Sequence, residues 1–156
     1  MAQLIYNTFD SGLAACHVEL LRNYLGVIGG LVANVTVVPQ EETQPQQLPL
    51  VVVSATEQNE AVFQTGIYEV TVEFSVRVDM DAGGADQLRT LSSAVLDYLQ
   101  QTDLKTQLTA VRDPENNALA TVKLLVLGSA RLEEIGDRQW GRVFIQKAFG
   151  YTPARS

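Results

Sequence analysis

Cysteine and histidine are almost absent from this chain of 156 residues, which has one of each, Cys16 and His17. A single cysteine excludes a disulfide within the chain. A single histidine makes a metal site built from several imidazoles implausible, and any nucleophile–histidine pair would have to use His17. Adjacent side chains on a helix diverge by about 100°, so Cys16 and His17 do not face each other. We expect a buried, inert Cys16 thiol beside a surface His17.

Basic residues and long apolar runs are also scarce. Lysine and arginine total 11 against 18 aspartates and glutamates, which gives a net charge of −7 and argues against a domain that grips nucleic acid. Apolar runs stay well short of the roughly 18 residues that a membrane span needs. The N-terminal stretch MAQLIYNTFD lacks the basic and apolar regions of a signal peptide. We therefore expect a soluble protein without membrane contact, made and used in a cytoplasm.

The clearest positive feature is the stretch GIYEVTVEFSVRVD at residues 66–79, in which apolar and polar residues alternate without a break. Strict alternation predicts a strand with one buried face, and this one would run roughly 40 Å, far longer than the usual strand of about 5 or 6 residues. The apolar positions should face the core. The polar positions should point away from it, and they are Glu69, Thr71, Glu73, Ser75, Arg77 and Asp79.

Two helices and five strands are predicted for the whole chain, the long strand at residues 66–79 included. Amphipathic periodicity predicts helices at about residues 9–26 and 86–99, with a short further turn at 104–108. The strands are expected at residues 31–38, 50–54, 66–79, 122–127 and 139–151, and the polar connections at 40–48, 56–65, 112–118 and 128–137. Short connections favour antiparallel pairing between consecutive strands. The prediction is one α+β domain, residues 1–156, with a mainly antiparallel sheet of about five strands and two helices packed on one face.

No constellation of residues indicates catalysis or cofactor binding. The aspartates at positions 79, 81 and 86 lack the regular spacing of a calcium loop, and turn formation and helix capping explain them better. Glu133 and Glu134, with Asp137 and Arg138, are better explained as a solvated loop than as a general acid and base. We expect no catalytic, cofactor or metal site, and no enzymatic activity.

An N-terminal helix is followed by LPLVVVS, by the long strand YEVTVEFSVRVD and by the helix DQLRTLSSAVLDYLQ. This order of elements resembles the tail terminator and tail-completion proteins of tailed bacteriophages. The resemblance covers roughly residues 4–107 and returns in the closing strand WGRVFIQKAFGY.

The resemblance implies a structural protein of the virion. Members of that family are small α+β domains that form a hexameric ring, cap the tail tube at its final length and meet the head-side connector. The implied partners are therefore further copies of the chain, the tail tube protein and the connector protein. The implied place is the head-proximal end of the tail, after assembly in the host cytoplasm. DNA would pass through the channel without specific binding, and acidic groups around it would repel the passing polyanion.

A closed ring requires two different faces of each subunit to meet. The polar face of the long strand, with Glu69, Glu73 and Arg77, suits either water or contact with an adjacent copy. Arg138 and Trp140 are further interface candidates, since tryptophan often anchors interfaces, although a lone tryptophan in a strand is more often part of a core. The four polar connections are candidate contact segments as well.

Two other classes of function remain open at the level of sequence. One is a neck or head-completion protein, or another tail component built on a related fold. The other is a small cytoplasmic α+β module that binds a small molecule or a protein partner. An enzyme remains only if carboxylates alone carry out the chemistry.

Overall fold

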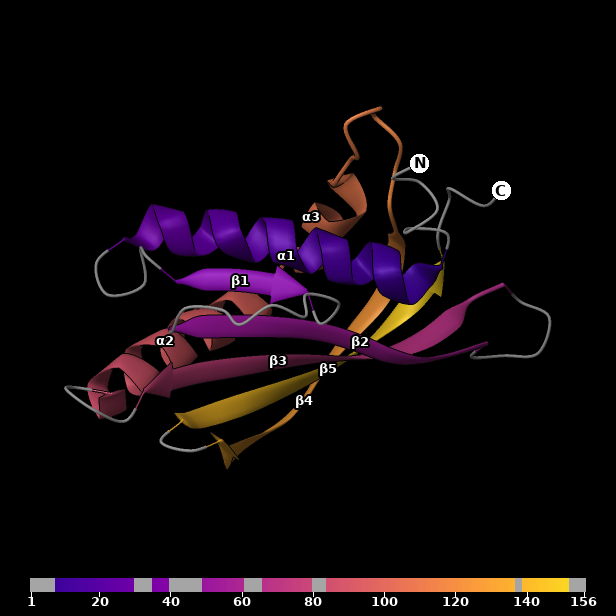
Figure 1. Ribbon diagram of the computed structural model, residues 1–156. Helices are drawn as coiled ribbons and strands as arrows, with labels where there is room; N and C mark the ends of the chain where they lie inside the picture. Colours follow the sequence, from indigo (N-terminus) through magenta and orange to yellow (C-terminus); the bar gives the residue numbers. More distant parts are fainter. Residues whose placement is uncertain are drawn as a thin grey trace.

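A computed structural model describes residues 8–29, 35–39, 49–60, 66–79, 84–136 and 139–151 of the chain (Figure 1). Within these ranges five strands form one sheet, in the spatial order β1-β2-β3-β5-β4. The strands are β1 (Thr36–Pro39), β2 (Leu50–Glu60), β3 (Tyr68–Asp79), β4 (Thr121–Gly136) and β5 (Gln139–Tyr151). The last strand of the chain thus lies between β3 and β4. All pairs are antiparallel except β1 with β2.

The parallel pairing of β1 with β2 differs from the antiparallel pairing expected for consecutive strands. The chain between Pro39 and Leu50 could extend over about 30 Å, which exceeds the length of the four-residue β1. That reach allows the chain to return to the start of β1 before β2 begins, so no tight hairpin is required. β1 confirms the end of the strand predicted at residues 31–38, of which residues 31–34 lie outside the described part of the chain.

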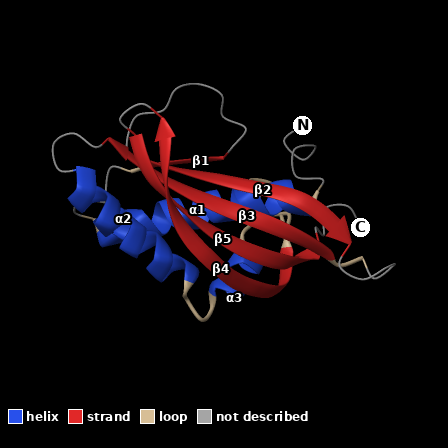
Figure 2. Cartoon of the chain, turned by 90° about the horizontal axis from the view of Figure 1, so that it is seen from below, coloured by secondary structure: helices blue, strands red, loops and turns tan. Residues whose placement is uncertain are grey.

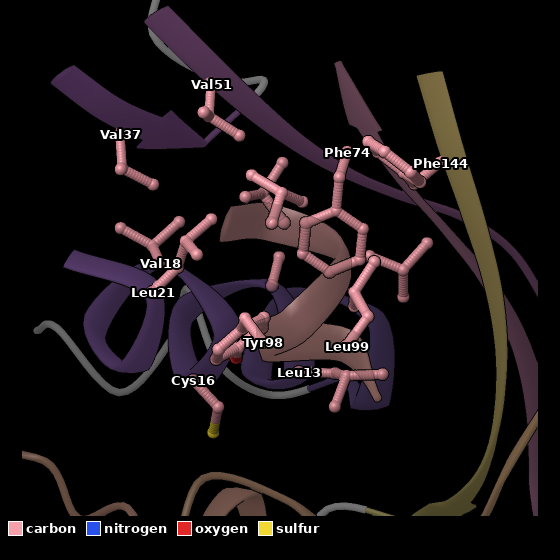
Figure 3. Packing of buried hydrophobic residues seen from close by; sticks show 14 of the residues in the cluster. Leu13, Cys16, Val18, Leu21, Val37, Val51, Phe74, Tyr98, Leu99 and Phe144 are labelled. Atoms are coloured by element: carbon pink, nitrogen blue, oxygen red, sulfur yellow. The ribbon is translucent and has the colours of Figure 1, made fainter. Parts of the chain in front are cut away.

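Within the described ranges, three helices cover one face of the sheet: α1 (Phe9–Ile28), α2 (Gly84–Leu99) and α3 (Leu104–Ala110). In Figure 2 the strands lie in front of α1 and α3. Buried side chains from all three helices join those of the sheet in one hydrophobic cluster. Figure 3 shows Phe74 of β3 and Tyr98 of α2 within this cluster. The predicted α+β class is confirmed, with the expected short turn present as α3.

The long strand predicted at residues 66–79 is confirmed as β3, which has 12 residues. From Val70 to Val78 the apolar side chains are buried, and the polar side chains that alternate with them are partly exposed. The register with β5 is unbroken from Tyr68 opposite Gly150 to Asp79 opposite Gln139. β3 therefore forms the centre of the sheet, with its apolar side on the helices.

The loops predicted at residues 56–65 and 128–137 are wrong for their described residues, which belong to strands, whereas residues 61–65 and 137 lie outside the described part. Residues 56–60 continue β2, and residues 128–136 continue β4. In both places the pairing register shifts, between Thr56 and Asn59 in β2 and between Leu127 and Ala130 in β4. Such irregularities interrupt the two-residue alternation that identifies a strand in sequence, while the ladder to the neighbouring strand continues. The connection expected at residues 40–48 lies outside the described residues.

Candidate subunit interface

The face of the sheet opposite the helices carries a row of polar side chains along β3. This polar row consists of Glu69, Thr71, Glu73, Ser75, Arg77 and Asp79, and all of them are at least partly exposed to solvent. The structure therefore brings together three of the five predicted interface residues, Glu69, Glu73 and Arg77. Their common orientation follows from the two-residue period of the strand.

Glu69 and Arg77 of the polar row each contact a neighbouring side chain on the outer face. The ammonium of Lys147 on β5 lies 3.5 Å from a carboxylate oxygen of Glu69. The Nε of Arg77 donates a hydrogen bond of 3.1 Å to the hydroxyl of Ser75. Exposed ion pairs of this kind contribute at most about 1 kcal/mol to stability. These two contacts do little for folding, and the side chains of Glu69 and Arg77 remain partly exposed to solvent.

An apolar strip lies beside the polar row on the same face, and the sequence interpretation missed it. It is formed by two exposed residues of β4 and two half-buried residues of β5, namely Leu124, Val126, Ile145 and Phe149. Leu124 lies opposite Phe149, which in turn lies opposite Glu69. A signal was present in the run VKLLVL, because consecutive apolar residues place apolar side chains on both faces of a strand.

The other two predicted interface residues are less well placed. Arg138 lies outside the described residues. The backbone of Trp140 is part of β5, opposite Val78 of β3 and Glu134 of β4. The side chain of Trp140 is outside the described part, so its role as an interface anchor stays a prediction.

The predicted loop at residues 112–118 is confirmed as an exposed turn closed by a backbone bridge between Arg112 and Ala118. The carboxylate of Asp113 accepts hydrogen bonds from the amides of Glu115 and Asn117, at 2.9 and 2.8 Å. The hydrogen bonds to Asn117 lower the pKa of Asp113. Asn116 adopts a positive φ of 68°, which asparagine tolerates in turns.

The prediction of a surface histidine is wrong, because His17 is fully buried between α1 and the sheet. Its Nδ1 lies 2.8 Å from the hydroxyl of Tyr98, and its Nε2 lies 3.0 Å from Oε1 of Gln146. Since a carboxamide oxygen only accepts, Nε2 carries the proton and Nδ1 accepts from Tyr98. These three residues, the buried polar cluster, join α1, α2 and β5 across the core. The ring of Phe74 packs edge-on against the imidazole, with ring centres 4.8 Å apart.

Burial disfavours the charged forms of His17, Tyr98 and Cys16. It lowers the pKa of His17 to about 3, and the hydrogen bond to Gln146 opposes the shift only partly. Burial also raises the pKa of Tyr98 well above its ordinary value. The Cys16 thiol is buried as predicted, and burial raises its pKa to about 12. At neutral pH all three groups are uncharged, which suits a structural role in the core.

The described residues provide little for metal chemistry or membrane insertion. Among them, no group of three or more His, Cys, Asp or Glu side chains is arranged to hold a metal ion. None of the described helices combines the length and apolar character needed to cross a membrane. The outer face of the sheet, with its polar row and apolar strip, is thus the feature with the clearest chemical means of binding a partner.

Comparison with solved structures finds a similar chain in the virion of a native gene transfer agent (GTA) particle. The two chains superpose with a TM-score of 0.57 and are 20% identical, and the match covers 86% of this chain and 91% of the other. At this identity the likeness establishes a shared fold. Neither models of known protein families nor curated proteins match the chain.

Proposed function

We propose that this protein is a non-enzymatic structural component of a phage-like virion, and specifically a tail terminator. In this role it forms a ring that caps the tail tube and joins it to the head connector. The fold carries the proposal, because a chain of a gene transfer agent virion shares it over 86% of this chain and nearly the whole of the other. The order of elements in the sequence supports the same function independently.

The surface chemistry agrees with assembly into a ring around DNA. The outer face combines apolar side chains with a charged row, which is the composition of an interface with a dry centre and a polar rim. The net charge of −7 disfavours tight contact with a polyanion, so DNA can pass without being held. The proposed location is the head-proximal end of the tail.

The test is the mass and shape of the purified full-length protein, measured by light scattering and negative-stain imaging over a range of concentrations. A hexameric ring with a central hole is the expected result. Because a terminator can also close its ring on the tube end, the same protein is incubated with tubes assembled from the tail tube protein. Rings on one end of each tube support the proposal. A protein that stays monomeric and leaves both tube ends bare contradicts it.

Neck and head-completion proteins on a related fold are distinguished in the same experiment. Such a protein would bind the isolated connector but leave the tube ends uncovered. A terminator is expected to bind the tube end first and to recruit the connector afterwards.

A further inference from the structure

Among the described residues, the exposed large apolar side chains form two groups on different elements. Val27 and Ile28, the helix knob, end α1 and are 89% and 50% exposed. Leu124 and Val126 of the apolar strip are 51% and 46% exposed. Single exposed apolar residues are common, but here each group consists of neighbours, and the strip continues into Ile145 and Phe149.

The helix knob and the apolar strip lie at opposite ends of the subunit. The ring of Phe9, the first residue of α1, lies against Gly150, the neighbour of Phe149 in the strip. From Phe9 the helix runs for 20 residues, so Val27 and Ile28 lie about 28 Å further along its axis. Figure 1 shows the start of α1 near the end of β5 and the other end of α1 far from it. The knob therefore cannot cover the strip of its own chain.

The charges around the two groups are complementary. Three lysines lie within or beside the strip. Lys123 precedes Leu124, and the Lys105 ammonium is 3.5 Å from the carbonyl oxygen of Lys123. Lys147 lies opposite Val126, between Ile145 and Phe149 on the same face of β5. Within the described residues, Lys147 is the one of the three that forms an ion pair, with the carboxylate of Glu69. At the helix knob, the last turn of α1 contains no basic residue. The partial negative charge of the helix C-terminus is therefore not offset within that turn.

We propose that the helix knob of one copy of this protein packs on the apolar strip of the next copy, with the lysines beside the strip facing the carbonyl end of that α1. The inference rests on the proposed ring and names its contact surfaces. Two different surfaces at opposite ends of one chain make a heterologous contact, which closes into a ring when the rotation between copies permits. The knob and strip alone are smaller than the roughly 800 Å² per partner of a stable interface, so ring closure or the tube must strengthen the contact.

Cysteine cross-linking tests this geometry without requiring a stable complex. Val27→Cys and Val126→Cys are made as separate full-length variants, mixed in equal amounts and treated with a short bis-maleimide. The buried Cys16 thiol, with its pKa of about 12, does not compete in the folded protein. The matched control pairs Val27→Cys with Thr90→Cys, since Thr90 is exposed on α2 and belongs to neither surface.

The expected result is a covalent dimer that forms at least about tenfold faster in the Val27→Cys and Val126→Cys mixture than in the control mixture. Equal rates would overturn the proposal, and so would faster linking of either variant with itself, which would indicate a symmetric contact. The mass of the untreated wild type separates this outcome from the proposed function. A ring without the cross-link refutes the contact alone, whereas the cross-link without any ring or tube binding refutes the terminator.

Discussion

At the scale of single residues, His17 gives the core a pH dependence whose sign is fixed. Its pKa is about 3 in the folded protein and about 6.5 when the chain is unfolded. Below pH 6.5 the unfolded state therefore binds a proton that the folded state does not. The part of the unfolding free energy that depends on neutral His17 is fully present above pH 6.5. It is lost as the pH falls towards 3, by about 1.4 kcal/mol per pH unit.

The wild type should thus lose about 2 kcal/mol more free energy of unfolding between pH 7 and pH 5 than His17→Gln, which cannot protonate there. Urea unfolding at the two pH values measures the difference. Because the chain has one histidine, its imidazole proton signals can also be followed directly by NMR in the folded wild type. Signals that shift with a midpoint near pH 6 would contradict the burial of His17 and the depressed pKa.

Two glycines of α1 should respond oppositely to alanine. A Cβ at Gly12 would overlap the carbonyl oxygen of Leu119, whereas a Cβ at Gly26 meets open space. Gly12→Ala is therefore expected to destabilise the fold by about 1–3 kcal/mol through overpacking. Gly26→Ala should stabilise it by up to about 1 kcal/mol, since alanine favours helix. Chemical denaturation of both variants is the measurement, and equal effects would contradict the close approach of α1 to Leu119.

At the scale of elements, the polar row of β3 should matter for assembly and little for folding. The double variant Glu69→Lys, Glu73→Lys reverses two charges on the outer face and removes the carboxylate beside Lys147. We expect it to prevent ring formation or tube capping, while the free energy of unfolding changes by no more than about 1 kcal/mol. Light scattering and urea unfolding read the two effects separately.

A matched control makes the same charge change on the helix side of the subunit. Glu19 of α1 and Asp97 of α2 are both exposed there, so Glu19→Lys, Asp97→Lys should still assemble. If both double variants lose assembly equally, net charge rather than the outer face is responsible. If neither does, the polar row is only solvated.

Elements with regular periodicity could be predicted from sequence, and their irregular continuations could not. β3 alternates without error and was placed almost to the residue. β2 and β4 contain register shifts, and beyond these their polar sequences were interpreted as loops. The strand character of such ends comes from pairing with β3 and β5, which local composition does not contain.

At the scale of the whole molecule, contacts between residues far apart in the sequence explain why the partners of His17 and the apolar strip could not be predicted. His17 stands four residues after Leu13 and four before Leu21, so its spacing already indicated the buried face of α1. Its partners Tyr98 and Gln146 are 81 and 129 residues away, and only the fold brings them together. The three polar residues of β3 were identified because one strand's periodicity orients them, whereas the apolar strip needed the register between β4 and β5.

Folding and assembly should be separable on the two faces of β4. Leu124 and Val126 are exposed on the outer face, whereas Leu125 and Leu127 pack against the core. Leu124→Ser, Val126→Ser should leave the unfolding free energy of the monomer within about 0.5 kcal/mol of the wild type but weaken assembly. Leu125→Ser, Leu127→Ser should cost about 2 kcal/mol or more, because the substitutions leave cavities beside the core. Urea unfolding at low concentration and light scattering at high concentration give the two readouts.

Unchanged assembly of the Leu124, Val126 variant would mean that the apolar strip is not a subunit contact. Equal destabilisation by both pairs would contradict the assignment of the two faces, on which both the ring and the contact between knob and strip depend.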